Sequence, residues 1–272
     1  MAQPRSFSTS LEITPPARAN ATVLLRRARA LDPLVDDVNV IDRDGRLSSL
    51  ECAGLLADAG IRCTWNLRTR GRSRAEVERD LAHAADQALD RVVCVRGERG
   101  ARDREDTPRL HEVIERARSL LPGAEIGATL NPYAAGDRVQ KNLFAKLAAG
   151  ATFVQTNLVF GLDDLDAMAE PIRAAFPDVR ILVMVRPFAD AEEASRVASR
   201  VGAQTARDPR GPVMPIGPAA FRELVDQVAR SPLYAGVTLM TPRMDLDPVE
   251  ADALRAVLAR GVALGGARRD GA

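Results

Sequence analysis

Short apolar runs alternate with longer amphipathic stretches along most of the chain. The runs are four to six residues long and rich in Val, Ile and Leu, as buried parallel strands require. The sequence predicts strands at Ser10–Ile13, Asp37–Ile41, Cys63–Leu67, Arg91–Val95, Glu125–Thr129, Phe153–Thr156, Arg180–Val185 and Gly236–Met240. Helical periodicity predicts helices at Ala19–Leu31, Leu47–Ala59, Ser73–Leu89, Pro108–Leu121, Asp137–Ala149, Asp163–Phe176, Ala191–Val201, Gly217–Arg230 and Pro248–Ala259.

Strand and helix alternate eight times, which implies parallel pairing with right-handed crossovers. Eight such units favour a single (β/α)8 TIM barrel over an open, doubly wound sheet. No G-x-G-x-x-G follows the first strand, as a dinucleotide-binding sheet would require. We expect the barrel domain to span residues 1–264, with a long Pro/Gly-rich loop at Arg207–Pro215. Residues 265–272 (GGARRDGA) predict a disordered tail.

Composition narrows the range of partners. The 272 residues suit one α/β barrel, for which about 250 are typical. A formal net charge of +1 gives no reason to expect nucleic acid or an anionic membrane as a partner. The three cysteines form no C-x-x-C pair, so we expect no disulfide framework and no metal site. Together with a polar start that lacks a signal peptide, this favours a cytoplasmic protein. The oligomeric state does not follow from the sequence, and we expect a monomer or a small homo-oligomer.

In such a barrel the chemistry lies on the carboxyl ends of the strands. Glu12 sits inside the apolar run Leu11–Ile13 and is followed by Pro15 and Pro16. A carboxyl group there would face the barrel mouth, and burial would raise its pKa enough to hold or deliver a proton near neutral pH. The alternative is a solvated acid on a frayed first strand.

Further polar residues follow other strands. Asn66 could hydrogen-bond a ring or amide edge, or simply form a turn, and Arg96 and Glu98 flank a glycine that allows close backbone approach. Gln155 and Asn157 are two residues apart on one strand, so we expect them to share a face. Two amides facing a barrel interior are costly unless something uses them, which favours a functional role.

Several segments, taken in order, resemble the methylenetetrahydrofolate reductase family. The resemblance is good from Ser10 to Phe160 and loose beyond. Its motifs are Ser10–Pro16 (SLEITPP), Val38–Leu50 (VNVIDRDGRLSSL), Ala59–Arg68 (AGIRCTWNLR), Arg91–Glu98 (RVVCVRGE), Gly127–Pro132 (GATLNP) and Lys146–Phe160 (KLAAGATFVQTNLVF).

The resemblance implies reduction of 5,10-methylenetetrahydrofolate to 5-methyltetrahydrofolate. It places Glu12 on the family's catalytic acid and Glu98 where an Asp lies near flavin and substrate. Asn157 falls on a folate-binding Gln, with Gln155 beside it. Two further candidates for substrate binding are Arg243, after the eighth strand, and Glu51, which could instead be a first-turn acid favoured by the helix dipole.

The departures from the family pattern concern the flavin. Positions that usually contact FAD carry other residues: Ile41, Asn66, Glu98, Asn131, Val139 and Ala145. Others remain, namely Arg96, Asn142 and Lys146. Since some members of the family pass hydride directly from NADH to the folate, we expect NADH here and disfavour FAD. The candidate cofactor-binding residues are Asn66, Arg68, Arg96, Asn131 and Lys146.

Three other interpretations stay open at this point. The chain could be an FAD-dependent member of the same family. It could be a barrel that binds a folate or another pterin without catalysis. It could also be a demethylase that uses tetrahydrofolate as the methyl acceptor. The choice between NADH and NADPH is open as well, because no nucleotide-binding motif identifies a ribose-binding acid.

Overall fold

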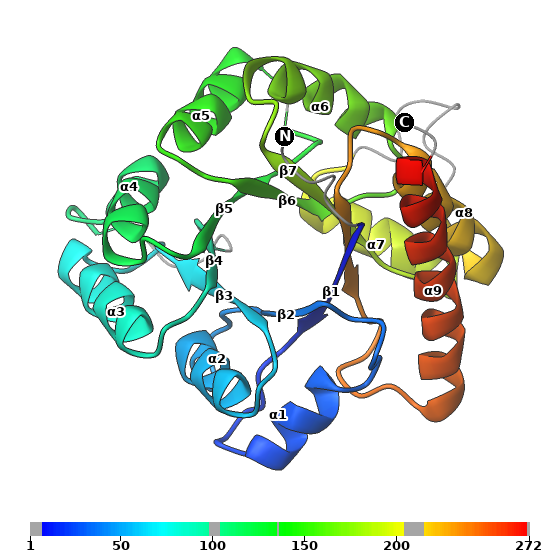
Figure 1. Cartoon of the computed structure of the whole chain (residues 1–272), viewed down its shortest axis with the longest axis horizontal. Helices are drawn as coiled ribbons and strands as arrows, with labels where there is room; N and C mark the ends of the chain where they lie inside the picture. Colours follow the sequence, from blue (N-terminus) through cyan, green and yellow to red (C-terminus); the bar gives the residue numbers. More distant parts are fainter. Residues whose placement is uncertain (1–6, 98–103, 135, 204–214, 271–272) are drawn as a thin grey trace.

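Eight parallel strands close into a ring surrounded by helices (Figure 1). A computed structural model describes residues 7–97, 104–134, 136–203 and 215–270, with side chains as far as residue 267. Each strand pairs with its neighbours in sequence, and the last returns to the first. The strands are β1 (Ser8–Ile13), β2 (Asp37–Val40), β3 (Cys63–Arg68), β4 (Arg91–Val95), β5 (Glu125–Leu130), β6 (Phe153–Leu158), β7 (Arg180–Val185) and β8 (Gly236–Met240). The predicted (β/α)8 barrel is confirmed.

Helices connect the strands and cover the outside of the barrel (Figure 1). They are α1 (Ala21–Ala28), α2 (Ser49–Asp58), α3 (Arg74–Asp86), α4 (Leu110–Leu120), α5 (Asp137–Ala148), α6 (Asp163–Ala175), α7 (Ala191–Val201), α8 (Gly217–Arg230) and α9 (Pro248–Asp270). Both α7 and α8 lie between β7 and β8. The predicted loop Arg207–Pro215 falls outside the described residues except for Pro215. Within the described ranges, no helix is both long and apolar enough to cross a membrane.

Local signals in the sequence set several helix ends. The Ser73 hydroxyl accepts a hydrogen bond from the Glu76 backbone N–H (3.2 Å), and the Glu76 carboxylate accepts one from the Ser73 N–H (2.6 Å). This reciprocal cap satisfies two amides that the first turn of α3 leaves unpaired. At the other end of a helix, Gly202 closes α7 with a φ of +83°, a conformation that favours glycine.

The end of the chain differs from the expectation of a disordered tail beginning at residue 265. Helix α9 continues to Asp270, and Gly265 is buried. A Cβ built on Gly265 would lie 2.4 Å from the Phe7 Cβ, so the glycine allows the helix to approach the start of β1. Gly265 therefore serves close packing here, whereas the sequence suggested flexibility. Residues 271 and 272 lie outside the described part of the chain.

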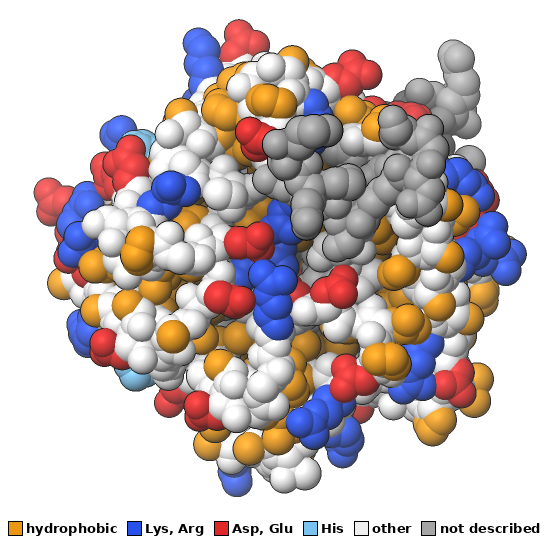
Figure 2. All heavy atoms as spheres, in the orientation of Figure 1, with side chains coloured by type: hydrophobic (Ala, Val, Ile, Leu, Met, Phe, Trp, Pro, Cys, Tyr) orange, Lys and Arg blue, Asp and Glu red, His pale blue; other side chains and the backbone are white. Residues whose placement is uncertain are grey.

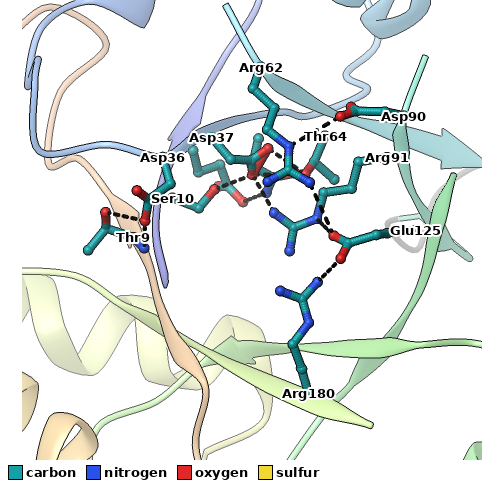
Figure 3. A network of polar contacts seen from close by, with 12 residues as sticks. Thr9, Ser10, Asp36, Asp37, Arg62, Thr64, Asp90, Arg91, Glu125 and Arg180 are labelled. Carbon is teal, nitrogen blue, oxygen red and sulfur yellow. Dashed lines mark hydrogen bonds and ion pairs between the residues drawn. The ribbon is translucent and has the colours of Figure 1, made fainter. Parts of the chain in front are cut away.

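The first residues of four strands form an ionic layer at the amino-terminal end of the barrel interior (Figure 3). Arg91 is 1% exposed and pairs through Nη1 with Asp37 Oδ2 (3.1 Å) and through Nε with Glu125 Oε2 (3.2 Å). Glu125 also pairs with Arg180 (2.5 Å). Figure 2 views the barrel end-on and shows basic side chains flanked by acidic ones at the centre of this face. Such a layer fixes strand register, because each buried charge needs its partner.

An apolar layer lies next to this ionic layer inside the barrel. Val93, Phe153 and Leu182 come from β4, β6 and β7 and pack together as a cluster separate from the core between strands and helices. The Phe153 ring lies 4.5 Å from the Arg91 guanidinium carbon. Gly127 on β5 makes room for this ring, since a Cβ there would lie 2.2 Å from the Phe153 Cζ. The barrel is therefore filled and is not a pore.

Candidate active site

Glu12 is the fifth residue of β1 and faces the barrel interior near its carboxyl end. It lies in register with Asn39 of β2 and Met240 of β8. Strand alternation puts it on the same face as Ser10, whose hydroxyl donates to Asp37 in the ionic layer (2.9 Å). Glu12 is 8% exposed. The expected inward orientation is therefore found, and the alternative of a solvated acid on a frayed strand is not.

Burial changes the acidity of Glu12. It raises the pKa from the ordinary value of 4.5 to about 7, while a hydrogen bond from Asn39 opposes part of this rise. A carboxyl group with a pKa near 7 is present in both protonation states at neutral pH. It can therefore donate a proton and later recover it, as general acid catalysis requires.

Two amides connect Glu12 with the neighbouring strands. The Asn39 side chain donates from Nδ2 to Glu12 Oε2 (3.2 Å). Asn66 on β3 donates from Nδ2 to Asn39 Oδ1 (2.5 Å) and to the Val40 carbonyl (2.9 Å). All three side chains are buried. Asn66 thus lies within β3 and joins the Glu12 group, and it does not form a turn.

Gln155 and Asn157 lie on β6, across the ring from β2. Gln155 is 5% exposed and forms no hydrogen bond with its side chain to any other described residue, whereas Asn157 is half-buried. The pairing of β6 with β7 shifts register between Gln155 and Leu158. The pairing with β5 stays regular through Thr156, so the shared face of Gln155 and Asn157 stays a prediction. The unpaired amide of Gln155 remains available to a ligand.

Helix α7 covers an apolar cluster at the carboxyl ends of β6 and β7. Phe160 and Phe188 stack there with ring centroids 5.4 Å apart and an interplanar angle of 17°. Buried residues of α7, among them Ala194, pack against them, and so does Met240, the register neighbour of Glu12. The Tyr133 hydroxyl accepts a hydrogen bond from the Phe160 N–H (2.9 Å). One side of the candidate site is therefore apolar and aromatic.

Arg68, at the end of β3, is held by acids of the loop between β2 and α2. Its guanidinium pairs with Asp42 (3.3 Å) and with Asp44 (2.6 Å). Burial raises the pKa of Asp42, and the positive charge of Arg68 opposes that rise. Gly97, which the sequence suggested as a place for close ligand approach, is adjacent to Arg68 instead. A Cβ on this glycine, whose φ is +92°, would lie 2.6 Å from Arg68 Cδ.

Three other predicted cofactor-binding residues have internal partners. Lys146 donates from Nζ to the Thr129 carbonyl (2.6 Å), and burial lowers its pKa to about 8. Asn131 donates to the Val201 carbonyl (3.3 Å). Arg96 is half-buried, and its own carbonyl accepts a hydrogen bond from the Arg70 N–H (2.9 Å). The contacts of Asn131 and Arg96 anchor loops that follow strands, and the contact of Lys146 joins α5 to β5.

Two predicted residues are not brought to Glu12. Glu51 accepts a hydrogen bond from the Ser48 N–H (3.3 Å) in the capping box of α2 and is exposed. Its position fits the alternative considered from sequence, a first-turn acid. The side chain of Arg243 is 68% exposed and pairs with Glu250 on α9 (3.1 Å). Glu98 lies outside the described residues.

A cavity of about 260 Å³ lies on the outer side of β1, between α1 and α9. Leu11 and Thr14 line it together with Arg27. The Arg27 guanidinium is already paired with Asp245 (3.0 Å) and donates to the Thr14 carbonyl (3.0 Å). This cavity therefore gives no better site than the barrel interior. Among the residues with described positions, no three His, Cys, Asp or Glu side chains gather as a metal site would require.

Sequence reasoning missed Asn39. It lies inside the second strand, whereas the barrel fold predicts the chemistry at the residues that follow each strand. The signal was present as a two-residue period, because Asp37 and Asn39 alternate with Val38 and Val40. Alternating polar residues in an otherwise apolar strand indicate a polar barrel interior.

The chain is similar to one protein family in sequence and to a solved structure in fold. Residues 1–207 match the family model described as methylenetetrahydrofolate reductase. No curated protein matches the chain. A solved structure titled "Uncharacterized protein from Clostridium thermocellum binds two copies of 5-methyl-5,6,7,8-tetrahydrofolic acid" is similar, with a TM-score of 0.65 and 13% sequence identity. The match covers 97% of this chain and 96% of that one. At this identity the similarity shows a shared fold.

Proposed function

The chain belongs to the methylenetetrahydrofolate reductase family, and from this we propose that it reduces 5,10-methylenetetrahydrofolate to 5-methyltetrahydrofolate by direct hydride transfer from NADH. The observation that carries the proposal is the buried carboxyl group of Glu12. It faces the barrel interior at the carboxyl end of β1 and has a pKa raised to about 7. This is the end at which barrel enzymes place their chemistry.

The reaction requires one proton and one hydride. Glu12 gives its proton to N10 of the folate as the bond from N10 to the methylene carbon breaks. The methylene carbon then belongs to a cationic iminium at N5, and a hydride from C4 of the nicotinamide converts it to the methyl group. NADH leaves as NAD⁺, and the ionised Glu12 takes a proton from water. While it is ionised, the carboxylate lies near the developing cation and stabilises it.

The environment of Glu12 suits this sequence of steps. Burial keeps part of the Glu12 population protonated at neutral pH, so the acid is available before ring opening. Across the ring, the Gln155 amide can bind a polar edge of a pterin, and the apolar cluster with Met240 can exclude water from the iminium. The C. thermocellum protein with the same fold binds the product of this reaction, according to its title.

A resident flavin does not fit the residues at the corresponding positions. Asn66 uses its Nδ2 donor group on Asn39 and the Val40 carbonyl. Lys146 is directed to the Thr129 carbonyl, and its pKa is lowered by burial, which weakens it as a fixed partner for a phosphate. On these contacts we propose a reaction without FAD.

The test is an assay of the purified protein with NADH and 5,10-methylenetetrahydrofolate. We expect NADH oxidation that depends on the folate, formation of 5-methyltetrahydrofolate by mass spectrometry, and no flavin absorbance. With NADH deuterated at C4, the label should appear in the methyl group. A flavin would exchange much of it with water. NADPH in parallel shows which nucleotide is preferred.

Two variants complete this test. Glu12→Gln should fold and bind folate yet lose most turnover, by about 100-fold or more. Glu170→Gln changes an exposed glutamate on α6 and should behave as the wild type. Folate binding without NADH oxidation in the wild type would favour the non-catalytic barrel, and bound flavin would favour the FAD-dependent enzyme.

A further inference from the structure

The direction of the hydrogen bonds around Glu12 is fixed by a backbone carbonyl. The Val40 carbonyl can only accept, so the Asn66 atom that lies 2.9 Å from it is the amide nitrogen. The same nitrogen lies 2.5 Å from the Asn39 side chain. Asn39 must therefore present its oxygen to Asn66.

Once its oxygen is engaged, Asn39 has only its NH2 group left for Glu12. This group lies 3.2 Å from Glu12 Oε2. The carbonyl oxygen of a protonated carboxyl group is a stronger acceptor than its hydroxyl oxygen. The Asn39 donor at Oε2 therefore favours the carbonyl there and the hydrogen of Glu12 on the other oxygen, Oε1. Asn39 and Glu12 pair in register on adjacent strands, and both are buried, which leaves little room for rearrangement.

We propose that Asn39 is a positioning residue that places the acid proton of Glu12 on Oε1, and that Asn66 sets the direction of this arrangement from the Val40 carbonyl. The inference rests on the proposed function for its catalytic meaning. The oxygen that carries the proton is then free of Asn39 and can face the folate N10. The same Asn39 bond stabilises the carboxylate left after proton transfer.

The deciding experiment replaces Asn39 by Leu, which keeps a similar size but has no amide. Loss of a hydrogen bond to a carboxylate should move the titration midpoint of Glu12 upward by about one pH unit. The midpoint is measured by ¹³C NMR of labelled glutamate carboxyls in the ligand-free protein, with Glu12→Gln identifying the signal. In the assay, kcat below about pH 6, where Glu12 is protonated in both proteins, should fall about tenfold with little change in KM, because the carboxylate left after proton transfer has lost its Asn39 donor.

A second variant guards against misfolding of Asn39→Leu. Asn39→Asp keeps the oxygen that accepts from Asn66 but replaces the NH2 group facing Glu12 Oε2 by a second oxygen. The two carboxyl groups then share a proton between them, at Oε2 of Glu12 instead of Oε1. It should also raise the Glu12 midpoint and lower kcat. As a matched control, Asn20→Ala removes the N-cap of α1, where Asn20 Oδ1 accepts from the Val23 N–H (3.1 Å). This control should lower thermal stability without moving the midpoint.

The outcomes separate the two proposals. A Glu12 midpoint in Asn39→Leu or Asn39→Asp equal to that of the wild type would overturn the role of Asn39, whatever the activity. A wild type that does not oxidise NADH with the folate would overturn the proposed function. The NMR titration would still test the hydrogen-bond direction in that case.

Discussion

Glu12→Gln should change how the stability of the folded protein depends on pH. In the folded state the Glu12 pKa is raised to about 7, and in the unfolded chain it returns to near 4.5. Between these two values the folded state binds more protons than the unfolded state. The free energy of unfolding of the wild type therefore falls as pH rises through this window. Gln has no proton to lose, so the variant lacks this contribution.

The size of the effect follows from the two pKa values. Raising a pKa from 4.5 to about 7 corresponds to about 3 kcal/mol, at about 1.36 kcal/mol for each pH unit. Because Glu12 is only 8% exposed, screening by solvent reduces this value little. Relative to the wild type, the variant should therefore gain about 3 kcal/mol between about pH 4 and about pH 8.

Urea unfolding of both proteins across this pH range measures the difference directly. The comparison removes the contributions of all other titrating groups, since both proteins share them. Glu170→Gln is the control, and its difference from the wild type should not vary with pH. A Glu12→Gln difference that stays constant from about pH 4 to about pH 8 would refute the raised pKa of Glu12. The same result would remove the physical basis for its role as an acid.

Two further predictions concern the layers beneath Glu12. Arg91→Leu should destabilise the fold by about 3–5 kcal/mol, because it leaves Asp37 and Glu125 without their shared cation. Urea unfolding at neutral pH measures this loss, and a loss below about 1 kcal/mol would contradict the stabilising role of the ionic layer. Gly127→Ala should cost about 1–3 kcal/mol, because the new Cβ would meet the Phe153 ring at 2.2 Å. Adding Phe153→Leu should restore part of that loss, and no recovery would argue against the contact.

Most of the fold could be predicted because its signals are local. The buried strands are apolar runs, and β4, β7 and β8 begin and end where the runs do. The helix starting after Ser73 follows from one capping motif. The end of α9 could not be predicted in this way, because Gly265 packs closely against Phe7, which lies far away in sequence.

The candidate site was only partly predictable, for a similar reason. Glu12 could be found from one strand, since an acid inside an apolar run at a strand end points into a barrel. Asn39 and Arg91 matter through side chains on neighbouring strands, and the sequence does not show which residues share an interior layer. The role of Glu51 could be predicted, because its partner in the capping box of α2, Ser48, is only three residues away in the sequence.

The interior layers explain how one barrel keeps an acid protonated near a set of arginines. A cation close to Glu12 would stabilise its carboxylate and lower its pKa. Burial raises the pKa of Glu12, and the hydrogen bond from Asn39 opposes part of this rise. The Phe153 ring, with Val93 and Leu182, fills the barrel between the two ends, and the ring lies against the Arg91 guanidinium. The apolar layer thus separates the arginines of the amino-terminal ionic layer from Glu12 at the carboxyl end. The arginines can stabilise their own layer without favouring ionisation of Glu12.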